Sequence, residues 1–239
     1  MVNYEQAFKK PFTDLVKLII GVVLTFIPIV HWIAKGFAIG SSGLDKTKKS
    51  SKMPEWKDWW HLFVRGLVSD IILFIYSIPG ILVMMMGFGL TIGPMLGMIM
   101  GAGITPEMLR NMGEYPGAWG GLFSQAMPSM LPQIISTTFL AAPSIIIGGL
   151  LLLLAFYISP MAVMNYVKNN SFSAAFDLGT LKKKILTGNY FITWLLIVVV
   201  TAIVVGVLSL LPLIGAAIGY FIMLIIGYSL YGEVYRETK

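Results

Sequence analysis

The feature that most restricts the fold is a long stretch without charge. No Asp, Glu, Lys or Arg occurs between Ile185 and Tyr231. A helix needs about 20 apolar residues to cross the hydrocarbon layer of a bilayer, so this stretch is long enough for two crossings. The whole chain is similarly apolar, with 57% hydrophobic residues, 12% charged residues and a mean hydropathy of +0.83. We therefore predict an all-α fold, a polytopic transmembrane helical bundle that forms a single domain over residues 1–239.

Apolar segments between polar or basic loops predict about six membrane-spanning helices. The first apolar stretch, Leu15 to Gly40, is interrupted by Pro28, and a turn at this proline would divide it into two short helices. The predicted helices cover residues 12–27, 29–44, 61–84, 131–157, 190–211 and 213–235. Residues 87–129 are rich in Gly, Pro and Met, and we expect them to form an insertion at the outer face. Within it, residues 88–104 are expected to form a broken or re-entrant segment.

The distribution of basic residues predicts which side of the membrane each loop occupies. With a turn at Pro28, Arg110 is the only one of the 17 Lys and Arg residues that lies clearly outside. Basic residues resist translocation, so this arrangement satisfies the positive-inside rule. It predicts a multi-pass protein of the cell membrane with both termini in the cytoplasm. Helices of ~16 residues span only ~24 Å of a ~30 Å layer, so a single crossing by Leu15 to Gly40 is the alternative.

Several classes of function lack the residues that they require. The chain has no Cys, which excludes disulfides and thiolate metal sites, and its two histidines, His31 and His61, form no spaced metal motif. It has no P-loop, no G-x-S-x-G and no H-E-x-x-H sequence. We therefore predict no catalytic residue, no cofactor and no metal site. The net charge of +6 is attributed to cytoplasmic basic loops and not to nucleic-acid binding.

Asp70 is the most unusual residue of the apolar segments. It lies about nine residues inside the third predicted helix, where an ionised carboxylate is costly unless it is paired or solvated. The functional interpretation is an ion or proton site, or one wall of a polar cavity. The structural interpretation is an ion pair with Lys35, which otherwise would extend its ammonium group toward the inner headgroups. Asp70 and Lys35 are thus a candidate intramembrane polar site.

A regular glycine pattern lies further along the same apolar segment, after Asp70. Gly89, Gly93, Gly97 and Gly101 recur every four residues, so a helix would place them in one smooth stripe. Such a stripe allows another helix backbone to approach closely, within the chain or between copies. Pro94 interrupts the pattern, which is why a broken or re-entrant helix is also considered. The stripe indicates helix packing and carries no indication of catalysis.

Two polar segments predict contacts with the membrane surface. Trp56, Trp59 and Trp60 follow a lysine-rich loop, which is typical of an interfacial helix with its indoles at headgroup level. A docking surface for a cytoplasmic partner is the alternative. The cluster Lys182 to Lys184 is expected to be solvated and to face anionic lipids.

Short motifs distributed along the chain indicate a family. They occur before and inside the first helix, before the third helix, and around the loop that follows residue 157. The motifs are Phe8 to Pro11, Ile27 to Val30, Met53 to Trp56 with Gly66, Tyr157 to Pro160 with Tyr166, and Ala174 to Asp177. With these motifs the chain resembles a family of integral membrane proteins from archaea and bacteria that is known only as a domain of unknown function. The resemblance implies a multi-helix membrane fold and implies no ligand, reaction or catalytic residue.

These features favour a non-enzymatic integral membrane protein. We expect a packing or assembly subunit of a membrane complex or homo-oligomer, because this role requires few polar residues within the membrane. The alternative is a small-solute or ion channel or transporter that uses Asp70. The expected partners are the lipid bilayer and other copies or membrane proteins.

Overall fold

The computed structural model describes residues 2–45, 52–101, 116–211 and 214–238, and the regular elements of these residues are all helical. The all-α prediction is therefore confirmed. The chain separates into two compact units. We call Met1–Tyr76 with Phe156–Lys239 the core unit, and Ser77–Ala155 the hairpin unit. Two long helices, α4 (Trp59–Gly101) and α6 (Pro116–Asn169), contribute residues to both units.

The first apolar stretch forms two short helices, with the turn at the predicted place. The chain begins with α1 (Tyr4–Lys9) and the 3₁₀ helix η1 (Lys10–Thr13), followed by α2 (Leu15–Thr25) and α3 (His31–Gly40). The proline ring disfavours a continued helix, and the next residue, Ile29, takes a positive φ of 72°. With 11 and 10 residues, α2 and α3 each span only ~16 Å, about half of the hydrocarbon layer.

Four helical stretches are long and apolar enough to cross a membrane. They are Trp59–Gly93 of α4, Ile134–Asn169 of α6, α8 (Gly188–Leu208) and α9 (Gly215–Glu237). The expected count of about six crossings is not confirmed, because α2 and α3 are shorter than the predicted segments at residues 12–27 and 29–44. Asp14 explains why α2 begins only at Leu15. Its side chain accepts a hydrogen bond from the Lys17 backbone N–H and so caps the start of the helix.

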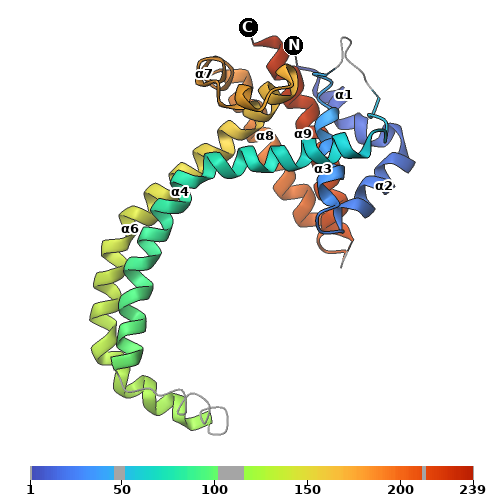
Figure 1. The fold of residues 1–239 in the computed structure, drawn as a ribbon. Helices are drawn as coiled ribbons and strands as arrows, with labels where there is room; N and C mark the ends of the chain where they lie inside the picture. The colour runs from blue at the N-terminus through green and yellow to red at the C-terminus, as the bar shows by residue number, and fades with distance from the viewer. Residues whose placement is uncertain (1, 46–51, 102–115, 212–213, 239) are drawn as a thin grey trace. The chain divides into compact units, whose positions relative to one another are not determined.

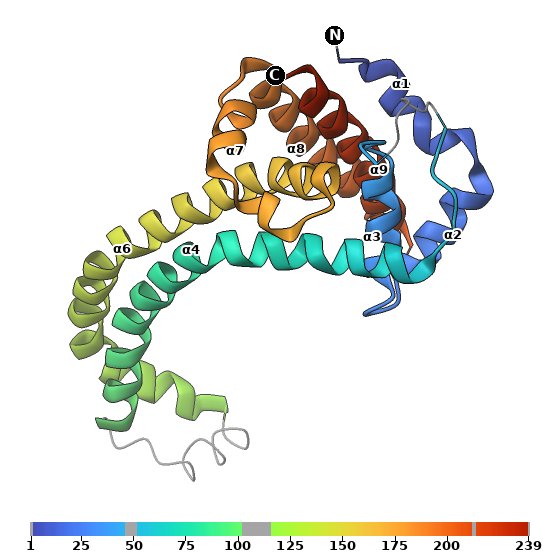
Figure 2. The same cartoon turned by 45° about the horizontal axis from the view of Figure 1, so that its top comes forward.

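The core unit is built around α9. This helix lies between α3 and α8 and also contacts α1 and α2 (Figures 1 and 2). Its side chains are buried along most of its length, including Phe221, Ile225, Leu230 and Val234. Glycine brings the neighbours close: a Cβ at Gly232 would lie 2.5 Å from the Ser42 carbonyl oxygen.

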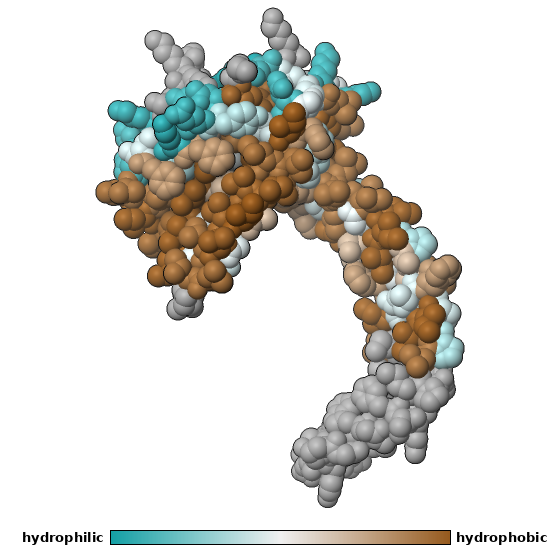
Figure 3. All heavy atoms as spheres, turned by 180° about the vertical axis from the view of Figure 1, so that it is seen from behind, coloured by the Kyte–Doolittle hydropathy of each residue, from teal (hydrophilic) through white to brown (hydrophobic). Residues whose placement is uncertain are grey.

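Polar residues of the core unit gather at one of its ends. Both termini and α7 (Leu178–Ile185) lie at this end, which we call the polar end, while the α2–α3 turn lies at the opposite end (Figure 1). Hydrophilic side chains cover the polar end and hydrophobic side chains cover the surface beyond it (Figure 3). This separation is the one expected for a membrane-embedded unit with one headgroup face.

The hairpin unit consists of α4 and α6 packed through glycines. A Cβ at Gly80 would lie 3.0 Å from the Gly148 carbonyl oxygen, and a Cβ at Gly148 would lie 3.0 Å from the Gly80 oxygen. No break interrupts the expected broken segment within the described residues, because α4 continues through Pro94 to Gly101, and α6 begins at Pro116. Transmembrane helices tolerate such a proline more readily than soluble ones. The part of the expected insertion at residues 102–115 lies outside the described residues.

Candidate intramembrane polar site

The predicted pair of Lys35 and Asp70 is brought together by a close crossing of α3 and α4. A Cβ at Gly36 would lie 1.8 Å from the Leu62 carbonyl oxygen, and a Cβ at Gly66 would lie 1.9 Å from the Trp32 oxygen. Only glycine fits at both positions, so the two backbones touch. Lys35 is adjacent to one of these glycines and Asp70 lies one turn after the other, which places both side chains beside the crossing.

Both carboxylate oxygens of Asp70 are engaged. Oδ1 forms an ion pair with the Lys35 ammonium, and Oδ2 accepts a hydrogen bond of 2.8 Å from Trp32 Nε1. The Lys35 side chain is 11% exposed and that of Asp70 is 36% exposed. Trp32 was missed by sequence analysis. Its position in the sequence could have indicated this role, because Trp32 lies one helical turn before Lys35 and its indole N–H can therefore reach Asp70 as well.

Lys35 also lines a cavity of ≈ 260 Å³ that lies wholly within the core unit. Most of the lining is apolar and comes from α4, α6, α8 and α9. Its other polar side chains are Ser69, Ser159, Thr201, Tyr220, Tyr228 and Tyr231. Sequence analysis did not identify these hydroxyl groups. The three tyrosines nevertheless fall within about 80° of one another around α9, at ~100° per residue, so helical periodicity could have placed them on one face.

A second polar cluster joins the N-terminus to the end of α9. Lys10 is 6% exposed, and its Nζ donates a 2.6 Å hydrogen bond to the Ser41 carbonyl oxygen. The Asn3 backbone N–H donates to Glu233 Oε2 at 2.6 Å, and Arg236 donates to the Gly43 carbonyl oxygen. These contacts hold α1, η1 and the residues after α3 against α9. The cavity among them has a volume of only ≈ 10 Å³, so the cluster stabilises the packing of these segments and leaves no room for an organic ligand.

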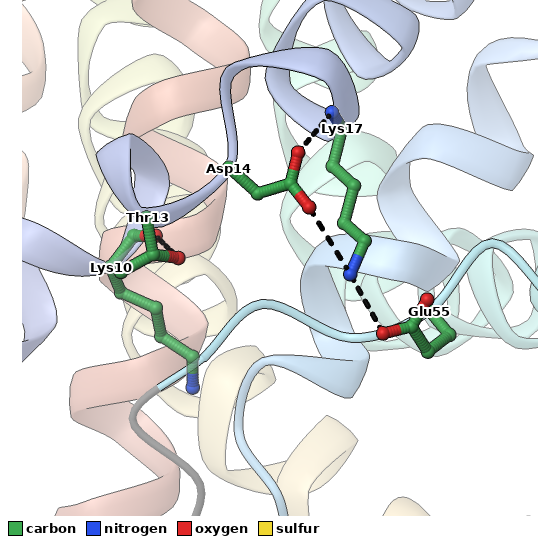
Figure 4. A network of polar contacts seen from close by, with 5 residues as sticks. All are labelled: Lys10, Thr13, Asp14, Lys17 and Glu55. Atoms are coloured by element: carbon green, nitrogen blue, oxygen red, sulfur yellow. Dashed lines mark hydrogen bonds and ion pairs between the residues drawn. The ribbon is translucent and has the colours of Figure 1, made fainter.

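Lys17 connects the start of α2 with the segment that precedes α4. Its Nζ lies 2.8 Å from Glu55 Oε1 and 3.4 Å from Asp14 Oδ2 (Figure 4). The hydrogen bond from Lys17 lowers the pKa of the exposed Glu55 carboxyl below its ordinary value. The network is a surface feature of the core unit, since the Glu55 side chain is 59% exposed, and it shares no residue with the pair of Lys35 and Asp70.

The tryptophan segment and the lysine cluster, both predicted to lie at the membrane surface, make part of their contacts within the protein. Trp56 stacks on Phe37 with ring centroids 3.8 Å apart, while Trp59 and Trp60 are exposed. Lys184 donates to the carbonyl oxygens of Tyr235 and Thr238 at the end of α9, and burial lowers its pKa. The expected lipid-facing group of three lysines is therefore reduced to Lys182 and Lys183, which are exposed.

The predicted glycine stripe makes no close contact among the described residues. Nothing lies within 4 Å of a Cβ at Gly89, Gly93 or Gly97, whereas Gly80 on the same helix touches α6. Gly89 lies ~180° around α4 from Gly80 at ~100° per residue, and Gly93 and Gly97 follow at ~220° and ~260°, so the stripe begins on the opposite face and winds gradually around the helix. Gly101 ends the helix, and its side-chain environment lies outside the described residues.

No group of three or more His, Cys, Asp or Glu side chains suited to a metal ion occurs in the described part of the chain. His61 instead contacts Arg65, with 2.8 Å between His61 Nε2 and Arg65 Nη2, and Arg65 pairs with Asp45 at 3.0 Å.

The long apolar helices and the partly buried ion pair of Lys35 and Asp70 define the chain as a multi-pass, all-α membrane protein. Residues 18–214 match the family described as "Protein of unknown function (DUF4013)", which covers most of the chain. The chain therefore belongs to this family, and the membership predicted from the short motifs is confirmed. Comparison with curated proteins and with solved structures gives no match.

Proposed function

We propose that the protein is a non-enzymatic assembly subunit of the cell membrane, which associates with a second copy or with another membrane protein through α4. The observation that supports this proposal is the open glycine stripe of the hairpin unit. Gly89, Gly93 and Gly97 form a smooth face with no neighbouring atom among the described residues. The glycine zipper formed by these residues would then be a contact between chains.

The other glycines of the hairpin unit support this interpretation. Gly80, Gly87 and Gly148 are all used to bring α4 and α6 together, with backbone or side-chain atoms 2.6–3.0 Å from an added Cβ. Lipid tails are as apolar as leucine, so membrane helices associate mainly where small residues allow close van der Waals packing. A second glycine face on the same helix thus provides a surface of the type that a further helix needs.

The topology that we propose places six helices in the membrane, of which α2 and α3 form a short pair that enters and returns on the cytoplasmic side. Both termini and α7 lie at the polar end of the core unit, and Arg236 and Lys182 contribute to its basic character (Figure 1). We assign this end to the cytoplasm because basic residues resist translocation. Single cysteines introduced at Lys182 and Leu210 test the assignment, since only Leu210 should react with an impermeant thiol reagent in intact cells.

The assembly proposal is tested by adding bulk to the glycine stripe. Gly93→Leu and Gly97→Leu should reduce the oligomeric or partner-bound fraction in nanodiscs, measured by mass photometry and by cross-linking in native membranes. Gly149→Leu is the matched control, since Gly149 is in the same unit and also has nothing within 4 Å. If all three variants match the parent, the stripe faces lipid and the proposal is wrong.

A second candidate function is a small-solute or ion channel or transporter that uses Asp70. It is supported by the cavity, because Lys35 both pairs with Asp70 and lines this space. Ion flux into liposomes that contain the parent or Asp70→Asn tests it. Flux that is lost in the variant while the melting temperature is unchanged would favour transport over assembly.

A further inference from the structure

The core-unit cavity differs from the other polar features of the molecule because it lies among helices that are long enough to cross the membrane. Its walls come from α4, α6, α8 and α9, with Lys35 of α3 at its edge. Phe156, Val163, Ile197 and Met223 make much of the lining apolar. Molecules that reach such a space from the bilayer are lipids, so the surroundings favour an apolar or amphipathic occupant.

Residues with hydrogen-bonding side chains line this apolar space. An ammonium group has three donors, and the one described partner of Lys35 is Asp70. Within the described residues, the hydroxyl groups of Tyr220 and Tyr231 have no recorded hydrogen bond. The interior of a bilayer has no water to compensate such groups, so a bound molecule with acceptor oxygens would stabilise them.

The charge of the site restricts the class of ligand further. Asp70 neutralises Lys35, so the pair has no net charge. An anionic ligand would add an uncompensated negative charge beside Asp70 in a medium of low dielectric constant. An uncharged oxygen, in a hydroxyl or carbonyl group, can accept from the tyrosines and from Lys35 without this cost.

The size of the cavity sets the part of the ligand that it can enclose. Pockets for complete drug-sized molecules have volumes of about 300–1,000 Å³, and this cavity is slightly smaller. It therefore accommodates a head group together with the first part of an apolar chain, with the rest of the chain in the bilayer.

We propose that this cavity binds an uncharged amphipathic lipid, whose hydroxyl or carbonyl oxygen accepts hydrogen bonds from Lys35, Tyr220 and Tyr231. Thr201 and Ser159 line the same space and provide further hydroxyl groups. This site belongs to the core unit and is independent of the assembly surface on the hairpin unit.

Photolabelling of the full chain in nanodiscs tests the proposal. The probes are a long-chain alcohol that carries a diazirine, the fatty acid of the same length and the corresponding hydrocarbon. Labelled peptides are mapped by mass spectrometry, and we expect the alcohol to label residues 156–163 and 220–231 more than either analogue. The double variant Tyr220→Phe with Tyr231→Phe should weaken competition by the unlabelled alcohol roughly 30-fold, since two hydrogen bonds of ~1 kcal/mol each are lost.

A pair of glycine variants separates the cavity from nonspecific labelling. A Cβ at Gly227 makes only ordinary contacts with Ile197 and Tyr231, so the longer side chain of Gly227→Leu would occupy the cavity and abolish labelling. Gly206→Leu adds the same bulk where nothing lies within 4 Å and should label like the parent. The melting temperature shows whether each variant is folded. If Gly227→Leu is not folded, the double variant Tyr220→Phe with Tyr231→Phe tests the proposal instead. Equal labelling by the hydrocarbon, stronger labelling by the fatty acid, or labelling unaffected in both folded glycine variants would overturn the proposal.

Discussion

The core unit and the hairpin unit are both apolar helical assemblies, but they are stabilised differently. In the core unit α9 contacts several helices, and 67% of its most apolar 18-residue segment is buried. Helix α8 of the same unit and the hairpin helix α6 are far more open, since only 11% of the most apolar segment of α8 is buried and Phe139 of α6 is 83% exposed. The core unit also contains buried polar contacts such as Lys10 with Ser41. The comparison indicates that α9 is held by contacts within the core unit, whereas the exposed faces of the hairpin unit are left to lipid or to a partner.

The largest effect is expected for the intramembrane ion pair of the core unit. Asp70→Asn leaves Lys35, whose side chain is 11% exposed, without its counter-charge. Loss of one partner costs ~3–5 kcal/mol in a fully buried pair, and the cost here should be less than this because the Asp70 side chain is 36% exposed. The melting temperature in nanodiscs should fall sharply, and Lys35→Met combined with Asp70→Asn should recover much of the loss. Lys35→Met alone serves as the third corner of the cycle. A double variant that is no more stable than Asp70→Asn would contradict a structural role of this pair.

A smaller effect is expected at the glycine contact of the hairpin unit. A Cβ at Gly148 would lie 2.8 Å from the Met84 backbone nitrogen, so Gly148→Ala forces α4 and α6 apart. Overpacking of this type costs ~1–3 kcal/mol, which proteolysis within the hairpin unit would detect. Gly149→Ala is the control, because its added Cβ meets nothing within 4 Å and alanine is the better helix former. If both variants are equally stable, the close packing of the hairpin unit is not confirmed.

The helices were predictable because membrane segments reveal themselves through the absence of charge. The turn at Pro28 followed from the missing N–H of proline, and the pairing of Lys35 with Asp70 followed from opposite charges in neighbouring apolar segments. The lengths of α2 and α3 were overestimated, because the turn residues Phe26 to Val30 are as apolar as the helices on either side of them.

Other features depend on contacts between residues that are far apart in the sequence, and no local sequence pattern predicts such contacts. Gly36 and Gly66 bring α3 and α4 together, but neither belongs to a long regular series, whereas the regular stripe at Gly89, Gly93 and Gly97 has no neighbour among the described residues. The hydrogen bond between Asn3 and Glu233 joins residues from opposite ends of the sequence. The cavity hydroxyls were missed for the same reason, because they come from four helices and converge only in the fold.

The smallest effect is expected at the surface of the core unit, where Lys17 meets Glu55 in water. The pKa of Glu55 is lowered in the folded state by the hydrogen bond from Lys17, so its contribution to stability is fully present above the ordinary value of 4.5. This contribution is lost as the pH falls through the lowered pKa. Glu55→Gln should therefore reduce the melting temperature slightly at neutral pH and converge with the parent in acid. Salt should weaken the difference, because exposed ion pairs are screened. The Lys35→Met and Asp70→Asn cycle provides the contrast, since its coupling should persist in high salt. A Glu55→Gln effect as large and as insensitive to salt as that of Asp70→Asn would show that the surface network contributes to stability as strongly as the intramembrane pair.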